Sequence, residues 1–268
     1  MSLANLLQSI NESEALILAT FIASIFSAWG VIYTQRSTHK QTIRRDEKIY
    51  YRDAYQKLYN PIISDVYYFL EVSAKKAEKE YPYHIEDGDT ELIFNKIISH
   101  IDQEIIYATS ELISARYRLK QARIRNIYDR ERRNNLSKIY LLFVFMNDLS
   151  DAVDRSGIFN KSSKQGLEKF RFLYAVWYLM TSLGGYNADA KGILLIREMI
   201  WIKEEEASMK IYKDAEKKVK KGFHEGDAFE VMLRFIATRT YTKRPEYSNV
   251  DALVKEARQI DEDNPDLR

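Results

Sequence analysis

The feature that most constrains the fold is an uncharged apolar segment near the N-terminus, from Ala15 to Tyr33. As a helix it would extend about 28 Å, close to the roughly 30 Å hydrocarbon core of a bilayer. Nine strongly apolar residues would each favour insertion by roughly 0.3–0.6 kcal/mol, which outweighs the small cost of one threonine and two serines. Trp29 and Tyr33 lie where interfacial aromatic residues are expected. The sequence predicts one transmembrane helix over residues 15–34.

The apolar segment has two other interpretations, a cleaved signal peptide and a buried core helix. A signal peptide carries basic residues before its apolar part, but residues 1–14 contain none and a basic cluster follows the segment instead. Core helices rarely continue this long without a charge. Because the positive charge is all on the C-terminal flank, we expect a bacterial inner-membrane protein with its N-terminus outside and its C-terminal domain in the cytoplasm.

Two sets of residues in and beside this segment are candidates for membrane contacts. The first consists of small residues at a spacing that lets two helices approach closely, which favours homo-oligomerisation, although small residues are common in any such segment. These packing candidates are Ala19, Ala23, Ser27 and Gly30. The second consists of cations that can bind lipid head groups or serve only as a topology signal. They are Arg36, Lys40, Arg44, Arg45 and Lys48.

The rest of the chain is predicted to be all-α. Only 9 Gly and 4 Pro in 268 residues provide too few turns for a β fold, and 46% hydrophobic residues suffice for a core. The absence of cysteine excludes disulfides, thiolate metal sites and cysteine nucleophiles. We expect a short extracytoplasmic N-terminus (1–14), the transmembrane helix (15–34), a juxtamembrane helix (35–60), a cytoplasmic helical bundle (61–262) and a frayed tail (263–268).

A long coiled-coil-like helix is predicted within the bundle. Apolar residues at alternating spacings of three and four form a seam from Ile98 to Ala122, and the helix is expected to run from Asp89 to about Arg130. Arginines flank the distal part of this seam. A parallel homodimer would bring like charges together, so its partner should be acidic or antiparallel, within the same chain.

The sharpest candidate binding site is the basic stretch from Ser114 to Lys138, which holds nine cations and two carboxylates. It could bind nucleic acid, another anion or a protein partner, or it could pair internally with the acidic segments Glu78 to Glu91 and Glu204 to Glu206. The candidate binding residues are Arg116, Arg118, Lys120, Arg123, Arg125, Arg130, Arg132 and Arg133.

No motif in the sequence indicates catalysis. The four histidines are far apart, no arginine precedes any of them at ribonuclease-motif spacing, and no glycine-rich phosphate loop is present. Three aspartates at Asp148, Asp151 and Asp154 could hold a divalent ion with Glu198, but a solvated acidic face explains them better. We expect no cofactor, no metal and no enzymatic activity.

The layout of one N-terminal membrane segment and a helical cytoplasmic domain resembles that of small bacterial proteins of prophages and phage-defence loci. The resemblance covers the layout and no motif. It implies a non-enzymatic membrane effector or sensor whose bundle receives a partner or anionic ligand and alters the membrane assembly, by permeabilisation or signalling. The alternatives are a membrane-tethered scaffold for a cytoplasmic protein, and a membrane-bound nucleic-acid-binding domain, HEPN-like, with an RNA-containing partner.

Overall fold

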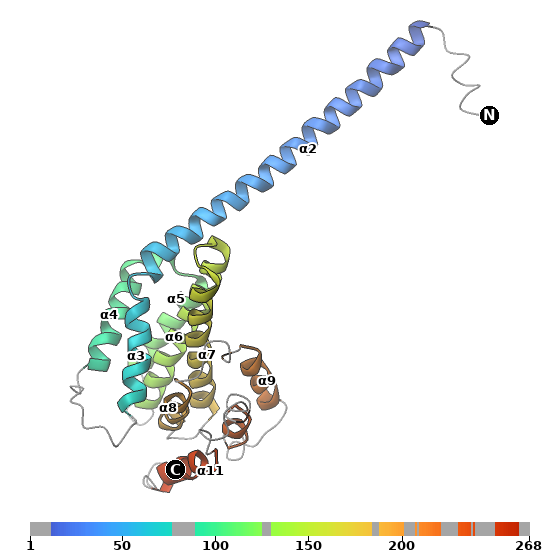
Figure 1. Cartoon of the computed structure of the whole chain (residues 1–268). Helices are drawn as coiled ribbons and strands as arrows, with labels where there is room; N and C mark the ends of the chain where they lie inside the picture. Colours follow the sequence, from blue (N-terminus) through green and yellow to red (C-terminus); the bar gives the residue numbers. More distant parts are fainter. Residues whose placement is uncertain are drawn as a thin grey trace. The chain divides into compact units, whose positions relative to one another are not determined.

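The described residues of the computed structural model fold mainly into helices (Figure 1). It describes residues 12–76, 89–124, 130–183, 188–200, 207, 209–220, 230–236, 238 and 250–262. All regular secondary structure in these ranges is helical, which confirms the all-α prediction. Contacts along the chain divide it into two compact units, residues 1–50 and 51–268.

The first unit is formed by most of helix α2, which extends from Glu12 to Ala54 and has 43 residues. Its last turn continues into a π-helical turn, η1 (Tyr55–Tyr59), where the Asn60 amide donates to the Tyr55 carbonyl at 2.8 Å. Ala54, Leu58 and Tyr59 are buried in the second unit. The bundle of the second unit therefore begins within the segment that was predicted as a juxtamembrane helix.

The second unit is a helical bundle in which α6 packs against both α5 and α7, α8 packs against α7 and α3, and α3 packs against α4. Residues 230–236 form a further helical segment. The elements are α3 (Ile63–Lys76), α4 (Asp89–Gln103), η2 (Ile105–Tyr107), α5 (Ser110–Ile124), α6 (Arg130–Ser156), α7 (Lys161–Leu183), α8 (Ala188–Met199), α9 (Met209–Lys220) and α11 (Val250–Glu262).

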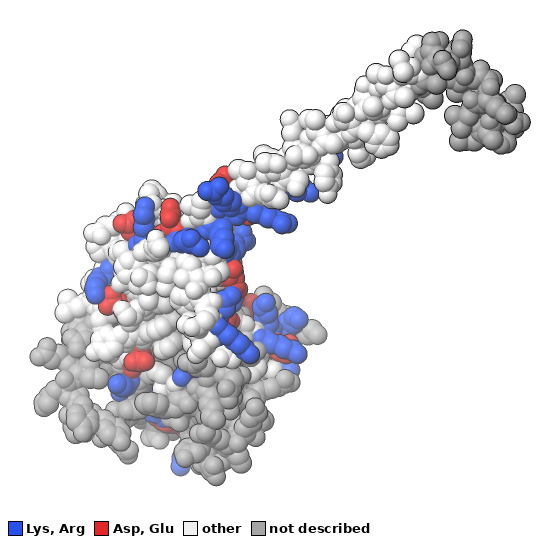
Figure 2. All heavy atoms as spheres, turned by 45° about the horizontal axis from the view of Figure 1, so that its top comes forward, with Lys and Arg blue, Asp and Glu red and all other residues white. Residues whose placement is uncertain are grey.

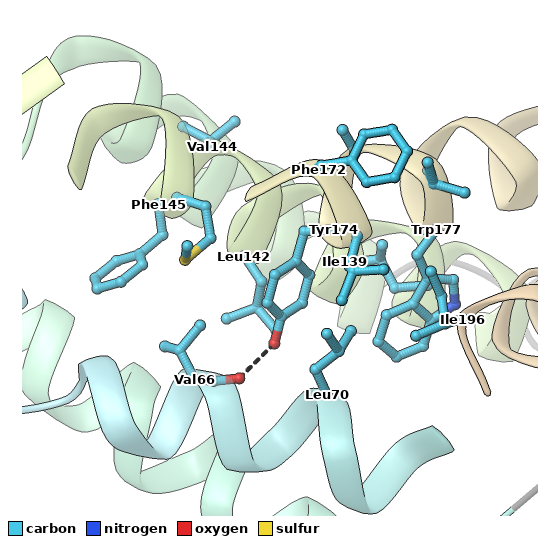
Figure 3. Close-up of a cluster of buried hydrophobic side chains, with 14 of the residues drawn as sticks. Val66, Leu70, Ile139, Leu142, Val144, Phe145, Phe172, Tyr174, Trp177 and Ile196 are labelled. Carbon is cyan, nitrogen blue, oxygen red and sulfur yellow. Dashed lines mark hydrogen bonds between the residues drawn. The ribbon is translucent and has the colours of Figure 1, made fainter. Parts of the chain in front are cut away.

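The centre of the bundle is the interface of α3, α6 and α7 (Figure 3). The run of large apolar residues in α6 supplies Leu142 and Phe145, both fully buried. Tyr174 of α7 is also fully buried, and its hydroxyl donates to the Val66 carbonyl of α3 at 2.6 Å. This bond ties α7 to α3, because a buried phenol without an acceptor would destabilise the fold.

Local signals set the boundaries of the central helices. Gly157 has φ of +67°, in the left-handed region that glycine adopts without steric cost, and it ends α6. Asn160 caps α7 by accepting a hydrogen bond from the Ser163 amide at 2.9 Å. Because the connection between them is short, α6 and α7 fold back on each other as neighbours in the bundle.

The prediction of one long coiled-coil-like helix from Asp89 to about Arg130 is wrong. Helix α4 ends at Gln103, Ala108 is extended with ψ of 144°, and Thr109 caps α5 by accepting from the Leu112 amide at 3.1 Å. Ile98 and Leu112 are both buried, so the apolar spacing was interpreted correctly as a buried face. It belongs to two helices, because the cap at Thr109 starts a new helix where the pattern alone would continue the old one.

Among the residues that the structure describes, no helix is both long enough and apolar enough to cross a membrane. The transmembrane part of the predicted fold is thus without support from this observation.

Candidate functional site

The first candidate site is the apolar half of α2, where large hydrophobic side chains are exposed around the helix. Leu16, Phe26 and Trp29 are 73%, 72% and 69% exposed. Single exposed hydrophobic residues are ordinary on protein surfaces, but a continuous apolar patch marks an interaction site. Lys and Arg are absent from the N-terminal described half of α2 and gather further along it (Figure 2).

Two hydroxyl groups in this part of α2 form hydrogen bonds within the helix itself. Thr20 donates to the Leu16 carbonyl at 2.8 Å, and Ser24 donates to the Thr20 carbonyl at 2.8 Å. A helix in an apolar environment needs such internal partners, because water is not there to provide them. The sequence analysis counted these hydroxyls only as a cost. It did not consider that each of these two hydroxyls can donate to the backbone carbonyl four residues earlier.

The predicted small-residue positions of α2 lie on one open face. Ala19, Ala23, Ser27 and Gly30 are all exposed, and a Cβ added at Gly30 would meet nothing within 4 Å. This face has room for the close approach of another helix.

The second half of α2 carries the predicted cation cluster. Arg36, Lys40, Arg44, Arg45 and Lys48 are all exposed, and none of them forms an ion pair with a described residue. Four of them recur every four residues, and like charges at that spacing repel along a helix. Asp46 and Glu47 offset part of this charge. The cluster therefore leaves a net positive helical surface that an anionic counterpart would stabilise.

The third candidate site is the basic stretch of α5 and α6, and the structure divides its residues into different environments. Arg116 is 8% exposed and makes two hydrogen bonds to Asp102 of α4, at 2.8 and 2.7 Å. The Arg116 hydrogen bonds hold the pKa of the Asp102 carboxyl below its usual value. Arg116 thus joins α5 to α4 and is not presented to a ligand.

Internal pairing also engages part of the remaining charge. Lys138 contacts Glu91 at 2.5 Å, and Arg123 lies 3.9 Å from the same carboxylate. Glu91 belongs to the acidic segment that was predicted as an internal partner. The guanidinium of Arg118 lies over the Tyr140 ring, 5.2 Å from its centre.

The other predicted cations are exposed or lie outside the description. Lys120 is exposed and has no ion pair within the described chain, and Arg133 is exposed with contacts of its own. Arg125 and the side chains of Arg130 and Arg132 are outside the described residues, as are Glu204 to Glu206.

Sequence analysis missed an apolar row on the solvent side of α5. Ile113, Tyr117 and Ile124 are 45%, 61% and 84% exposed, while Leu112 and Leu119 of the same helix are fully buried. The signal was available in the sequence, since α5 has apolar residues on two faces and a helix needs only one to pack in a bundle.

A second missed feature is the buried carboxyl of Asp148 on α6. Asp148 is 8% exposed and accepts a hydrogen bond from the Thr109 hydroxyl at the start of α5. Burial raises the pKa of Asp148 to about 7, against the lowering effect of the Thr109 bond. No group of three or more metal-binding side chains occurs among the described residues, and the side chain of Glu198, which completed the suggested aspartate site, lies outside them.

Comparisons with known proteins add no relative to these observations. No protein-family model matches the sequence, no curated protein is similar to it, and no solved structure matches its fold.

Proposed function

We propose that this protein is a non-enzymatic effector or sensor that is anchored in the bacterial inner membrane by its N-terminal helix. The observation that carries the proposal is the apolar half of α2, whose described large side chains are exposed. The cation cluster that follows would then lie at the head groups of the cytoplasmic leaflet, where each cation contributes on the order of 1 kcal/mol.

The anchor rests on the full apolar segment in the sequence. Ala15 and Leu18 belong to this segment, and their side chains lie outside the description of α2. With them, the uncharged stretch from Ala15 to Tyr33 is long enough for a bilayer core. The internal bonds of Thr20 and Ser24 further reduce the cost of placing these hydroxyls in lipid.

The first experiment tests the anchor. Membranes from expressing cells are washed with alkaline carbonate, and we expect the wild-type chain in the pellet. Ile22→Arg with Ile25→Arg should move it to the supernatant, because each arginine at the centre of a span costs roughly 2.5–3.5 kcal/mol. Ile49→Arg is the matched control, since Ile49 is an exposed isoleucine of α2 outside the apolar segment. Wild-type protein in the supernatant refutes the anchor.

The effector part of the proposal is that the bundle receives a partner or an anionic ligand and changes the assembly of the membrane helices. The open small-residue face of α2 supports assembly, and the basic surface of α5 supports reception. In detergent, we expect a homo-oligomer that Ala23→Leu disrupts and that Ala28→Leu, on the opposite side of the helix, leaves intact.

A monomeric wild-type protein whose expression leaves the membrane potential unchanged would contradict this part.

The second candidate function, a membrane-tethered scaffold, is favoured by the exposed apolar row of α5, which suits a protein partner. It predicts stoichiometric capture of one cytoplasmic protein that Ala23→Leu does not affect.

A further inference from the structure

The row formed by Ile113, Tyr117 and Ile124 on α5 has the geometry of one side of a helix–helix contact. At about 100° per residue, these positions lie within about 40° of one another around the helix, and they extend over about 16 Å of its length. The buried residues Leu112 and Leu119 face the bundle instead. The row is therefore a second apolar face that no described part of the chain covers.

The charged side chains that α5 itself places around this row are mostly positive. Lys120 lies within the row, and Arg118 and Arg123 lie on either side of it. Arg118 stacks on Tyr140, Arg123 forms a long ion pair with Glu91 at 3.9 Å, and Lys120 makes no ion pair within the described residues. Glu111, in the first turn, is the one carboxylate of α5.

We propose that this face of α5 is the docking site for an acidic amphipathic helix of a protein partner. The proposal rests on the proposed function that the bundle receives a partner, and it specifies which kind. Leucine-like side chains of the partner would pack between Ile113, Tyr117 and Ile124. Carboxylates beside them would pair with the three cations, as flanking charges select partners in coiled coils.

Two other occupants fit this surface less well. A second copy of the chain would bring a second set of the same three cations into the contact, with Glu111 alone to offset them. Nucleic acid would gain from the cations, but phosphates gain nothing from covering two isoleucines, and Arg116 is already engaged by Asp102. An acidic helix satisfies the apolar row and the cations at the same time.

The test measures binding of a fluorescent designed peptide to the full-length chain in detergent micelles. The peptide is a helix of about three heptads with leucine at the core positions and glutamate at the flanking positions. A second peptide has lysine in place of each glutamate, and a uridine oligonucleotide is the third probe. We expect the acidic peptide alone to bind, and Tyr117→Ser or Lys120→Glu to weaken its binding by about tenfold or more.

Leu92→Ser is the control variant, because Leu92 is exposed on α4 and lies outside the row; it should bind as the wild type does. The proposal is overturned if the acidic peptide does not bind, if Tyr117→Ser binds it equally well, or if the oligonucleotide binds instead. A doubled mass that Tyr117→Ser abolishes would assign the face to a second copy, also overturning it. Carbonate fractionation of the same variants separates this failure from failure of the membrane anchor.

Discussion

At the scale of single residues, Asp148 makes the bundle sensitive to pH. Its carboxyl is buried against the cap of α5, and Glu111 and Asp151 add to the effect of burial on its pKa, which is about 7. The ordinary pKa of an aspartate in an unfolded chain is near 4, so the folded state holds this proton more tightly. Between about pH 4 and pH 7 the folded chain therefore binds more protons, and its stability falls as pH rises.

We expect the free energy of unfolding in urea to fall by about 1–3 kcal/mol from pH 5 to pH 8. Asp148→Asn keeps an acceptor for the Thr109 hydroxyl and removes the charge, so it should be more stable than the wild type at pH 8 and lose most of this slope. Asp151→Asn, at an exposed position on the same helix, should keep most of the slope, because burial is the main cause of the raised Asp148 pKa. An unchanged slope in Asp148→Asn would show that other groups cause it.

Arg116 is the residue for which burial and sequence prediction differ most. Sequence analysis assigned it to a binding surface as part of the basic stretch. In the continuous helix predicted there, Asp102 lies 14 residues earlier and would be far from Arg116. The chain break between α4 and α5 brings them together. An arginine with two bonds to a carboxylate and 8% exposure holds the two helices in place.

Replacing one partner of this pair should be costly, since the other is left partly buried without its counter-charge. We expect Arg116→Ala to lower the free energy of unfolding by about 2–4 kcal/mol, measured by urea denaturation. Lys120→Ala, one turn later at an exposed position, should change it by less than about 0.5 kcal/mol. If the two substitutions lower the free energy of unfolding equally, Arg116 contributes no more to stability than an exposed surface cation, and the prediction is wrong.

At the scale of elements, α7 and α8 are held close by the absence of a side chain at Gly192. A Cβ at this position would lie 2.8 Å from Cδ1 of Trp177 and 3.1 Å from the Thr181 hydroxyl. The indole is 6% exposed and rigid, so it has little room to move away. Gly192 thus permits the close packing of these two helices.

Gly192→Ala tests this packing against helix propensity, because alanine favours a helix by up to about 1 kcal/mol over glycine. We expect the steric conflict to be larger, so that the variant loses about 1–3 kcal/mol of stability in thermal and urea unfolding. Gly30→Ala, at an open helical position of α2, should be neutral or slightly stabilising. A stabilised Gly192→Ala would mean that α8 can shift away from Trp177 at little cost.

The sequence identified helices better than it identified their ends. The apolar spacing in Ile98, Leu112 and Leu119 predicted their burial, because periodicity reports the face of a helix. The same spacing did not indicate the chain reversal at Ala108. The extended conformation of Ala108 and the cap at Thr109 each depend on one or two residues, and an apolar spacing of three and four residues does not detect them.

For the candidate sites too, some features could be predicted from the sequence and others could not. The exposure of Arg36 and Lys120 could be expected, because long cations lie at surfaces unless they are paired. The burial of Arg116 and Asp148 could not, because each depends on a residue that the folded chain brings from another helix. A sequence pattern predicts which face of its own helix a residue lies on. It does not predict contacts such as those of Arg116 and Asp148, which are formed between two helices.

At the scale of the whole molecule, the two units handle apolar side chains in opposite ways. The described part of residues 51–268 buries most of its apolar side chains in a common core, whereas the described part of residues 16–33 exposes its apolar side chains along a single helix. In our proposal the environment of this helix is a bilayer, and the direction in which the helix crosses it follows from the charges that flank it.

The absence of cysteine makes this direction measurable, since one introduced cysteine is the sole thiol of the chain. We expect a membrane-impermeant maleimide to label Ser9→Cys in intact spheroplasts and to label Gln56→Cys, an exposed position of η1, only after lysis. The reason is that residues 1–14 carry no cation, whereas Arg36, Lys40 and the cations after them resist translocation. Labelling of Gln56→Cys before lysis would reverse the topology, and it would place the basic face of α5 where no cytoplasmic partner could reach it.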